Sequence, residues 1–242
     1  MSRWIDDLVA TAHARLMVDR RAQAELYGRG VSDGQMRLFQ VGCLGARLPP
    51  LPEEAEPFRQ WHAGVLGVDT FVFPLTTPRG VVQGLQLRAR GQKRYQDYFL
   101  PGVADSVLFG LHEAVKAMWT TEAAWLVEGV FDAFPIQRYF PAVLPLLTDK
   151  VSDSVFRLLR RLVKRVWVGL DADPPGRRGA YTFKREHSRD FRVDVVLYPR
   201  IPLSGTTGFV KDPGELWDLQ GEEAIANLVR QVTADQTEFQ YA

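Results

Sequence analysis

The stretch of residues 123–173 constrains the fold more than any other part of the sequence. It opens with the apolar run Ala-Ala-Trp-Leu-Val before Glu128 and closes with Val-Trp-Val-Gly-Leu before Asp171 and Asp173. Short, unbroken apolar runs are typical of strands that are covered on both faces in a parallel sheet. The carboxyl ends of such strands line the ligand-binding crevice, so we expect these three carboxylates to meet at one edge of a sheet.

Carboxylates gathered at one edge repel each other unless a cation lies among them, and ligands that are all oxygen suit Mg²⁺ or Mn²⁺. Asp171 and Asp173 are two residues apart, which places both side chains on the same side of an extended segment. Asp212 follows a third predicted strand and precedes a proline, which keeps its backbone extended. We predict that these aspartates share one or two divalent ions. Glu128 is a fourth ligand, a general base toward a hydroxyl, or a group that orients metal-bound water.

Each carboxylate also has an ordinary structural explanation. Aspartates commonly cap helices and open turns, which would account for Asp171, Asp173 and Asp212. Asp132, in the helix that follows Glu128, would favour the positive end of that helix. The appearance of all of them in order, each after a strand, is what indicates a functional site.

The composition is that of a globular protein with one or two modest domains: 242 residues, 46% apolar and 24% charged. Its single cysteine excludes an internal disulfide, and its four histidines are not spaced as zinc ligands. No apolar run approaches the ~20 residues that cross a bilayer. Asp6 and Asp7 lie where a signal peptide would be apolar. We expect a soluble, cytoplasmic protein without a membrane partner.

A segment before residue 96 carries basic residues and no acidic ones. Within residues 70–96, two β-prone runs flank the turn Pro78-Arg79-Gly80, which predicts a hairpin. Alternation along the second strand places Arg88 and Arg90 on one face. A phosphate backbone fits against such a segment, although a basic run is also typical of a solvated face. The basic residues are Arg79, Arg88, Arg90, Lys93 and Arg94.

Helical spacing marks the rest of the first half. Ser2 is placed to cap a helix with an apolar face from Ile5 to Leu16, and Ser32 to cap a short helix through Phe39. The proline-rich and acidic residues 49–57 predict an exposed loop. A further helix has Val107, Leu108, Leu111, Val115 and Met118 on its buried side.

In the second half, strands and helices alternate, which predicts a parallel α/β sheet with right-handed crossovers. Beyond the two carboxylate-terminated strands we expect a short strand at 142–147, an amphipathic helix at 153–165, a strand at 192–198 and a last helix at about 222–232. The basic residues of the 153–165 helix lie off its apolar stripe.

The order of these acidic motifs resembles the TOPRIM domain, the metal-binding module shared by DnaG-type primases, topoisomerases and some nucleases. The resemblance covers about residues 120–218. It rests on Leu-Val-Glu128-Gly with Asp132, on Leu-Asp171-Ala-Asp173 with Gly-Arg177, and on Lys211-Asp212-Pro. The Lys-Asp-Pro element is similar to the primase form of the third motif.

Upstream segments also resemble the polymerase core of DnaG-type primases. They are Arg-Gly-Val-Ser at 29–32 with Phe-Gln-Val-Gly at 39–42, the segment 80–88, Tyr-Phe-Leu at 98–100 and Leu-Phe-Gly-Leu at 108–111. The resemblance implies an α/β protein in which an N-terminal α+β subdomain (1–119) packs on a TOPRIM subdomain (120–218) with its Rossmann-like parallel sheet. The active site lies between them, and a short C-terminal helical segment (219–242) follows.

The resemblance also implies roles. Asp171, Asp173 and Asp212 bind the metal ions, and Glu128 and Asp132 complete the catalytic acidic centre. Nucleotide or nucleic acid contacts fall to Arg79, Arg88, Arg90, Lys93, Arg94, Arg177 and Lys211.

The sequence departs from the family's pattern in places. Gly214 stands where the third motif usually has another aspartate, with Glu215 next to it as a substitute. A lysine expected before Leu108 is missing, and the cysteine count excludes a zinc ribbon within this chain. Little sequence follows the TOPRIM region, so we expect a minimal core of the phage or plasmid kind without a helicase-binding domain.

The implied activity is that of a DNA primase, a nucleotidyltransferase that makes short RNA primers. Its partners would be a single-stranded DNA template, an RNA primer and nucleoside triphosphates, with a replicative helicase or a separate zinc-ribbon protein as further candidates. Two other classes stay open: a TOPRIM nuclease acting at the same acidic centre, and a non-catalytic DNA-binding or replisome protein. A topoisomerase is disfavoured, because the chain has no room for a separate tyrosine domain.

Overall fold

The computed structural model describes residues 3–65, 68–92, 94–103, 106–147, 151–203 and 209–234. The chain forms two compact units. Unit 1 consists of Met1–Tyr27 and Val31–His112, and unit 2 of Gly28–Gly30 and Glu113–Ala242. The domain limits expected at residues 119 and 218 stay a prediction.

The sheet of unit 1 is antiparallel. Four strands follow the order β1 (Gly42–Leu44), β2 (Thr70–Thr76), β3 (Val82–Ala89) and β4 (Tyr95–Phe99), and β5 (Leu108–Phe109) also pairs with β2. The predicted hairpin is confirmed as β2 and β3. Gly80 in its turn has φ 81°, a conformation that favours glycine.

The helices of unit 1 are α1 (Arg3–Val18), α2 (Arg20–Gly28), α3 (Asp33–Leu38) and α4 (Glu56–Val65), with a 3₁₀ turn at Glu53–Ala55. The expected cap of α3 is confirmed, since the Ser32 hydroxyl accepts a hydrogen bond from the Gln35 N–H at 3.2 Å. The cap expected from Ser2 lies outside the described residues.

The exposed loop predicted for residues 49–57 is wrong beyond Pro52. Glu53–Ala55 forms the 3₁₀ turn, and α4 begins at Glu56. Pro57 lies in the first turn of α4, where a missing N–H leaves no hydrogen bond unmade. Ala55 and Phe58 are buried, so this segment contributes to the core while its glutamates stay at the surface.

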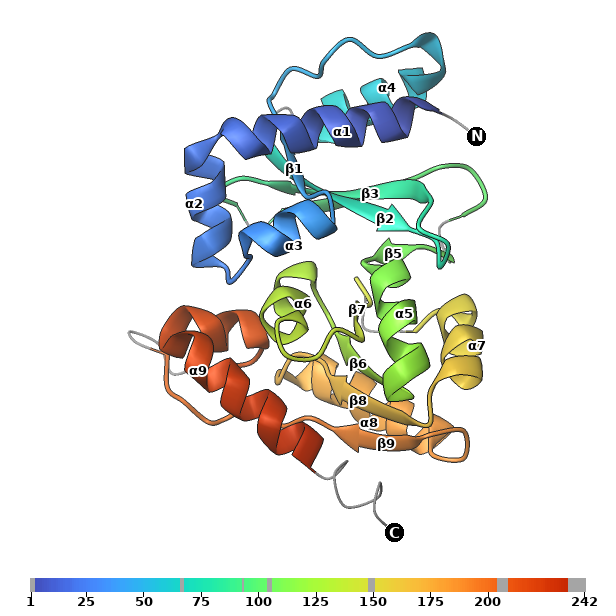
Figure 1. Ribbon diagram of the computed structural model, residues 1–242, viewed down its shortest axis with the longest axis vertical. Coiled ribbons are helices and arrows are strands. Elements are labelled where there is room, and N and C mark those ends of the chain that lie inside the picture. The colour runs from blue at the N-terminus through green and yellow to red at the C-terminus, as the bar shows by residue number, and fades with distance from the viewer. Residues whose placement is uncertain are drawn as a thin grey trace. The chain divides into compact units, whose positions relative to one another are not determined.

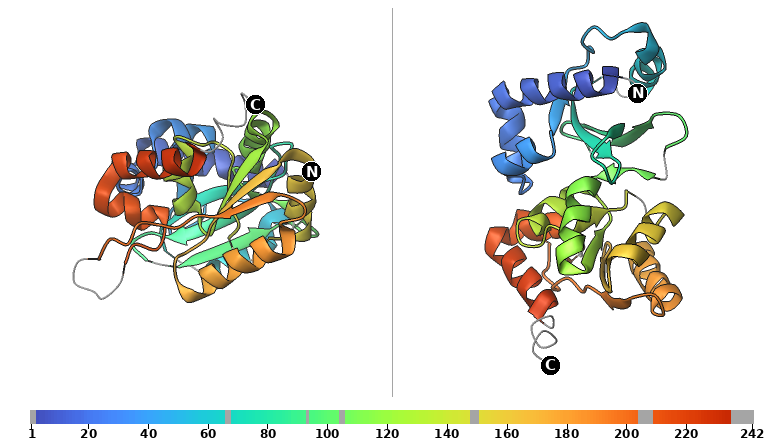
Figure 2. Two further views of the ribbon diagram at one scale, coloured as in Figure 1. Left: turned by 90° about the horizontal axis from the view of Figure 1, so that it is seen from below. Right: turned by 45° about the vertical axis from the view of Figure 1, so that its right-hand side comes forward.

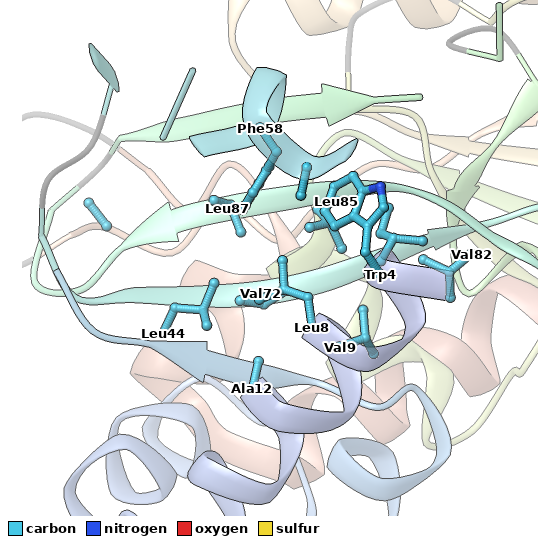
Figure 3. Close-up of a cluster of buried hydrophobic side chains, with 13 residues drawn as sticks. Trp4, Leu8, Val9, Ala12, Leu44, Phe58, Val72, Val82, Leu85 and Leu87 are labelled. Atoms are coloured by element: carbon cyan, nitrogen blue, oxygen red, sulfur yellow. The ribbon is translucent and has the colours of Figure 1, made fainter. Parts of the chain in front are cut away.

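The apolar face of α1 covers the sheet of unit 1. Figure 3 shows Trp4, Leu8 and Val9 of α1 directed toward Val72 and Leu85 of β2 and β3. Phe58 of α4 joins this cluster, its ring centroid 5.5 Å from that of Trp4. The helical spacing that predicts α1 is therefore the spacing of side chains buried in one core.

The sheet of unit 2 is parallel, as predicted. Its order is β7 (Val143–Pro145), β6 (Ala123–Val127), β8 (Arg165–Gly169) and β9 (Arg192–Val195). Every residue of the central strands β6 and β8 is buried, which explains their unbroken apolar runs. The buried Arg165 is compensated by Asp194 on the neighbouring strand, with 2.7 Å between the charged atoms.

Helices cover both faces of this sheet. They are α5 (Leu111–Thr121), α6 (Val130–Gln137), α7 (Asp153–Leu162), α8 (Pro174–His187) and α9 (Pro213–Thr233). Helices α6 and α9 lie side by side, and α8 lies on the opposite face of the sheet (Figures 1 and 2). Val107 and Leu108 precede α5 instead of forming its first turn, because Leu108 belongs to β5.

The last helix begins earlier than predicted. Instead of starting near Glu222, α9 starts at Pro213 and is interrupted at Gly221, which has φ 71° and ψ −158°. The predicted helix is the part after this kink. Among the described residues, no helix is long and apolar enough to cross a membrane.

Candidate active site

Glu128 and Asp132 follow β6, the central strand of unit 2. Glu128 is the first residue after the strand, and its carboxylate accepts a hydrogen bond from the Asp171 backbone N–H. Asp132 lies in the first turn of α6 and accepts from the Gly129 N–H at 2.9 Å through Oδ2. These contacts fix the start of α6 and join the end of β6 to the end of β8.

Asp171 and Asp173 follow β8 and lead into α8. The Asp173 side chain caps α8 by accepting a hydrogen bond from the Gly176 N–H at 3.0 Å. Gly176 packs against the Asp171 backbone so closely that a Cβ there would lie 2.3 Å from the Asp171 carbonyl oxygen. Only glycine allows this approach, so the Asp-x-Asp segment is held by the start of the helix it precedes.

Asp212 and Lys211 bring the segment before α9 to the same edge. The Lys211 carbonyl accepts a hydrogen bond from the Ala172 N–H at 2.7 Å. Asp212 caps α9 by accepting from the Glu215 N–H at 2.7 Å through Oδ1. The Lys211 ammonium contacts the Asp171 carboxylate and lies 3.5 Å from Asp212 Oδ2.

The structure thus brings all five predicted acidic residues together on one edge of unit 2. We call this set the carboxylate edge: Glu128, Asp132, Asp171, Asp173 and Asp212. Asp132, Asp173 and Asp212 each use one oxygen on a backbone N–H at a helix start. Their capping role, the ordinary explanation, is therefore correct, and it leaves each a second oxygen for another ligand.

Burial and mutual repulsion raise the pKa values of Glu128, Asp132, Asp171 and Asp212. Burial is the main cause for Glu128, whose pKa is raised further by the charges of Asp171 and Asp173. The pKa of Asp132 lies well above its ordinary value, because of burial and then the charges of Asp212 and Asp171. These groups gain from any cation that enters.

Asp171 and Asp212 also have raised pKa values through burial, although the Lys211 ammonium acts in the opposite direction on both. Burial disfavours the charged form of Lys211, yet its hydrogen bond to Asp171 and the nearby carboxylates raise its pKa overall. Lys211 therefore stays a cation at the carboxylate edge.

Tyr198 is a member of the site that the sequence did not reveal. Its buried hydroxyl donates a hydrogen bond to the Gly169 carbonyl at 2.5 Å. Its pKa is raised well above 10 by burial and then by the charges of four carboxylates, those of Asp132, Asp212, Asp171 and Glu128. No motif marks this tyrosine; its only sequence signal is its place at the end of the strand predicted for 192–198, which in the structure is β9 and ends at Val195.

Gly214 occupies a crowded position beside two of these carboxylates. A Cβ at residue 214 would lie 3.2 Å from Asp132 Oδ1 and 3.2 Å from Asp212 Oδ1. Glu215 turns away from that point and accepts a hydrogen bond from the Lys211 backbone N–H at 3.1 Å. The glycine thus leaves room next to the two aspartates, and Glu215 fixes the segment that carries Lys211.

The donor chemistry of the carboxylate edge fits a hard divalent cation such as Mg²⁺ or Mn²⁺, since its ligands are oxygens in mutually repelling carboxylates. Within the described part of the chain, however, no three histidine, cysteine, aspartate or glutamate side chains are arranged to hold one ion. Lys211 occupies the position between Asp171 and Asp212. The group is thus chemically suited to a cation but is neutralised in part by a lysine.

The other basic residues expected to bind nucleic acid differ in their surroundings. Arg88 of β3 lies over the Tyr95 ring at 4.8 Å and donates to its hydroxyl. Arg90 is held by Asp19 at 3.2 Å and by Glu25, and only 15% of its side chain is exposed. Arg79 and Arg94 are exposed, Arg177 is exposed in the first turn of α8, and Lys93 lies outside the described residues.

Comparisons with known proteins identify the fold. No family model matches the chain. The chain is 29% identical over 241 residues to DNA primase of Treponema pallidum. The DnaG catalytic core superposes with a TM-score of 0.68 at 22% identity, covering 95% of this chain and 78% of that one. This chain has the fold of the DnaG primase catalytic core. The mixed α/β architecture with a C-terminal helix is confirmed by that match.

Other primase structures give the same result. The zinc-binding and RNA polymerase domains of Aquifex aeolicus primase match with a TM-score of 0.65 at 24% identity, covering 96% of this chain and 62% of that one. A DnaG primase catalytic domain bound to single-stranded DNA matches with a TM-score of 0.67 at 21% identity, covering 95% of this chain and 80% of that one. The match to the Treponema pallidum protein covers 89% of this chain but only 37% of the relative.

Proposed function

We propose that this chain is a DNA primase catalytic core that makes short RNA primers on a single-stranded DNA template. The observation that carries the proposal is the carboxylate edge, formed at the ends of consecutive parallel strands in a chain with the DnaG fold. A related catalytic domain bound to single-stranded DNA supports the choice of template. Nucleoside triphosphates are the substrates, and the reaction is nucleotidyl transfer.

The metal would be held by Asp171, Asp173 and Asp212, with Glu128 as a further ligand. When bound, a divalent cation polarises phosphoryl oxygens and stabilises the charge that develops during nucleotidyl transfer. The helix caps make the ligands rigid, because Asp173 and Asp212 each keep one oxygen on a backbone N–H. Preorganised ligands lose little freedom when the cation enters.

The other side chains have roles set by their charge. Glu128 is suited to accept the proton of an attacking 3′-hydroxyl, because burial and the neighbouring aspartates raise its pKa toward the working pH. Lys211 orients Asp171 and Asp212 and places a positive charge where a triphosphate would lie. Asp132 holds the Gly129 backbone and adds negative charge to the centre.

The basic residues divide into two groups in this proposal. Arg79, Arg94 and Arg177 are exposed and are the better candidates for template, primer or nucleotide contacts. Arg88 is partly exposed beside Tyr95 and is a further candidate for a phosphate contact. Arg90 forms ion pairs with two carboxylates, and these contacts stabilise the end of the strand that carries Arg88.

The test is primer synthesis by the purified chain. Single-stranded DNA, labelled nucleoside triphosphates and Mg²⁺ or Mn²⁺ are incubated with wild type and with Asp171→Asn, and the products are separated on a gel. New short RNAs that vanish with Asp171→Asn support the primase. A shortened template without RNA would instead indicate a nuclease, and DNA binding without either product would indicate a non-catalytic protein.

A further inference from the structure

Helix α8 starts at the carboxylate edge and carries an unusual exposed face. Asp173 caps its first turn. One side of the helix is buried through Gly176, Ala180 and Phe183, which pack toward the sheet. The other side is at the surface of unit 2, on the face of the sheet opposite α6 and α9 (Figure 2).

Tyr181 lies at the centre of this exposed side, and 54% of it is accessible to solvent. On a helix, the surface neighbours of a residue are those three and four positions before and after it. For Tyr181 all four are basic and exposed: Arg177, Arg178, Lys184 and Arg185. No carboxylate occupies any of these positions, so the aromatic ring is surrounded by cations.

These cations are mostly uncompensated. Among the residues that the structure describes, Arg177, Arg178 and Lys184 have no ion-pair partner. Arg185 contacts its neighbour Glu186 at 3.3 Å, but both side chains are exposed and such pairs are weak. Helix stability does not explain Arg177 either, because a cation in the first turn opposes the helix dipole.

We propose that single-stranded nucleic acid binds along this face of α8, with a base stacked on Tyr181 and phosphates against Arg178 and Lys184. The proposal rests on the proposed function and names a path for its template or product. Tyr181 lies eight residues beyond Asp173, which is about 12 Å along a helix axis. A nucleic acid strand bound along this face of α8 therefore leads to the carboxylate edge within the same unit.

The aromatic ring decides between nucleic acid and an acidic peptide as the occupant. Both are attracted by the basic side chains, but only a base offers a flat π-face that stacks on an exposed ring. The charge pattern also matches a phosphate backbone, which carries a charge at each nucleotide. A second basic surface on α7 has no exposed aromatic ring. Arg157, Arg160 and Arg161 are exposed there, and Phe156, 5.9 Å from the Arg160 guanidinium, is only partly exposed.

The test measures binding of labelled single-stranded oligonucleotides to the whole chain by fluorescence anisotropy over a range of KCl concentrations. The variants are Tyr181→Ala, Tyr181→Phe and the pair Arg178→Ala with Lys184→Ala. The charge-matched control is Arg157→Ala with Arg161→Ala on α7. Circular dichroism confirms folding, which these exposed positions should not disturb.

We expect Tyr181→Ala to weaken binding about 10-fold with an unchanged salt dependence, and Tyr181→Phe to bind like wild type. The pair on α8 should lower the slope of log K against log[salt] by about 0.7 for each phosphate that the variant no longer neutralises. The α7 control should leave both quantities unchanged.

Equal binding by wild type and Tyr181→Ala would overturn the proposal, and so would equal effects of the α8 and α7 pairs. Tyr181-dependent binding of polyglutamate in place of DNA would overturn it in favour of an acidic peptide. If Tyr181→Ala binds DNA normally and still makes primers, only this inference fails. If the wild type binds no DNA, the proposed function fails with it.

Discussion

The carboxylate edge of unit 2 and the pair Arg88 and Arg90 of unit 1 differ in how their charges are compensated. Five carboxylates gather at the edge, with Lys211 as the cation among them. Arg90, directly after β3, is paired with two carboxylates, and Arg88 of β3 contacts an aromatic ring and its hydroxyl. A cluster with an excess of negative charge favours binding of a cation, whereas a charge that is already paired within the chain needs no ligand.

In the proposed function, this difference separates residues proposed to take part in the reaction from a residue, Arg90, that stabilises the fold. Raised carboxylate pKa values at the edge mean that the folded chain holds unfavourable charge there. The pKa of Arg90 is raised as well, but here the cause is the hydrogen bond and charge of Glu25, which stabilise the charged form. Four variants test the distinction.

The largest expected effect is on catalysis. Asp171→Asn removes a proposed metal ligand while keeping the shape of the side chain, and we expect primer synthesis to fall about 10³-fold. Product formation per minute on a single-stranded template measures it. Glu223→Gln, an exposed carboxylate on α9, is the control and should keep full activity. Equal loss in both variants would show that the edge has no special role.

The second-largest expected effect is on the stability of unit 1. Arg90→Ala removes the ion pairs with Asp19 and Glu25 and the contact with the Phe71 ring, so we expect the free energy of unfolding to fall by about 2 kcal/mol. Urea denaturation followed by circular dichroism measures the change. Arg79→Ala, at an exposed turn, should change stability by less than about 0.5 kcal/mol. A stable Arg90→Ala chain with impaired DNA binding would instead make Arg90 a binding residue.

A change of similar size is expected where α8 meets Asp171. In Gly176→Ala the new Cβ would meet the Asp171 carbonyl oxygen, and we expect a loss of about 2 kcal/mol in stability. Primer synthesis should fall too, because Asp171 must move. Gly28→Ala is the matched control, since nothing lies within 4 Å of its Cβ position. Unchanged stability and activity in Gly176→Ala would contradict the close packing described for this turn.

The smallest effect is a pH dependence. The folded pKa of Asp132 is above its ordinary value of 3.8, so the folded chain binds more protons than the unfolded chain. The contribution of Asp132 to the stability of the metal-free protein should therefore be fully present below pH 3.8. It should be lost as the pH rises through the pKa of the folded state. Asp132→Asn removes the charge and should be more stable than wild type by about 1 kcal/mol at pH 8.

Thermal unfolding in EDTA at pH 5 and pH 8 checks this prediction, with Glu223→Gln, an exposed position on α9, as a control outside the carboxylate edge. Adding Mg²⁺ at pH 8 should stabilise the wild type more than Asp132→Asn, because a cation relieves the repulsion in the wild type. A variant that is less stable than wild type at both pH values would contradict the account.

Much of unit 2 is predictable because its strands are buried on both faces. The apolar runs of β6 and β8 have no other explanation than a covered parallel sheet, and the carboxylates follow directly at their ends. Convergence of Glu128 and Asp171 then follows from the geometry of parallel strands. Asp212 lies well beyond the end of β9 at Val195, and the hydrogen bond from the Ala172 N–H to the Lys211 carbonyl brings it to the same edge. The role of each residue in catalysis stays a proposal.

Other features depend on contacts that sequence patterns do not reveal. The prolines in residues 49–57 indicate a loop, so the sequence does not predict the start of α4. A proline in the first turn is nevertheless favourable for a helix. The sequence does not predict the first half of α9, because Asp212-Pro213 is also typical of a turn. In the structure Asp212, Pro213 and Glu215 form a regular helix start. Arg90 shows the same limit, since its partners Asp19 and Glu25 are distant in sequence.

Binding of Mn²⁺ to the purified chain, followed by electron paramagnetic resonance of the free ion, tests the carboxylate edge most directly. Wild type and Glu223→Gln should bind Mn²⁺ equally, and Asp171→Asn should bind it more than about 10-fold less tightly. Mn²⁺ binding that is absent in the wild type, or unchanged in Asp171→Asn, would contradict the claim that these carboxylates form a metal site.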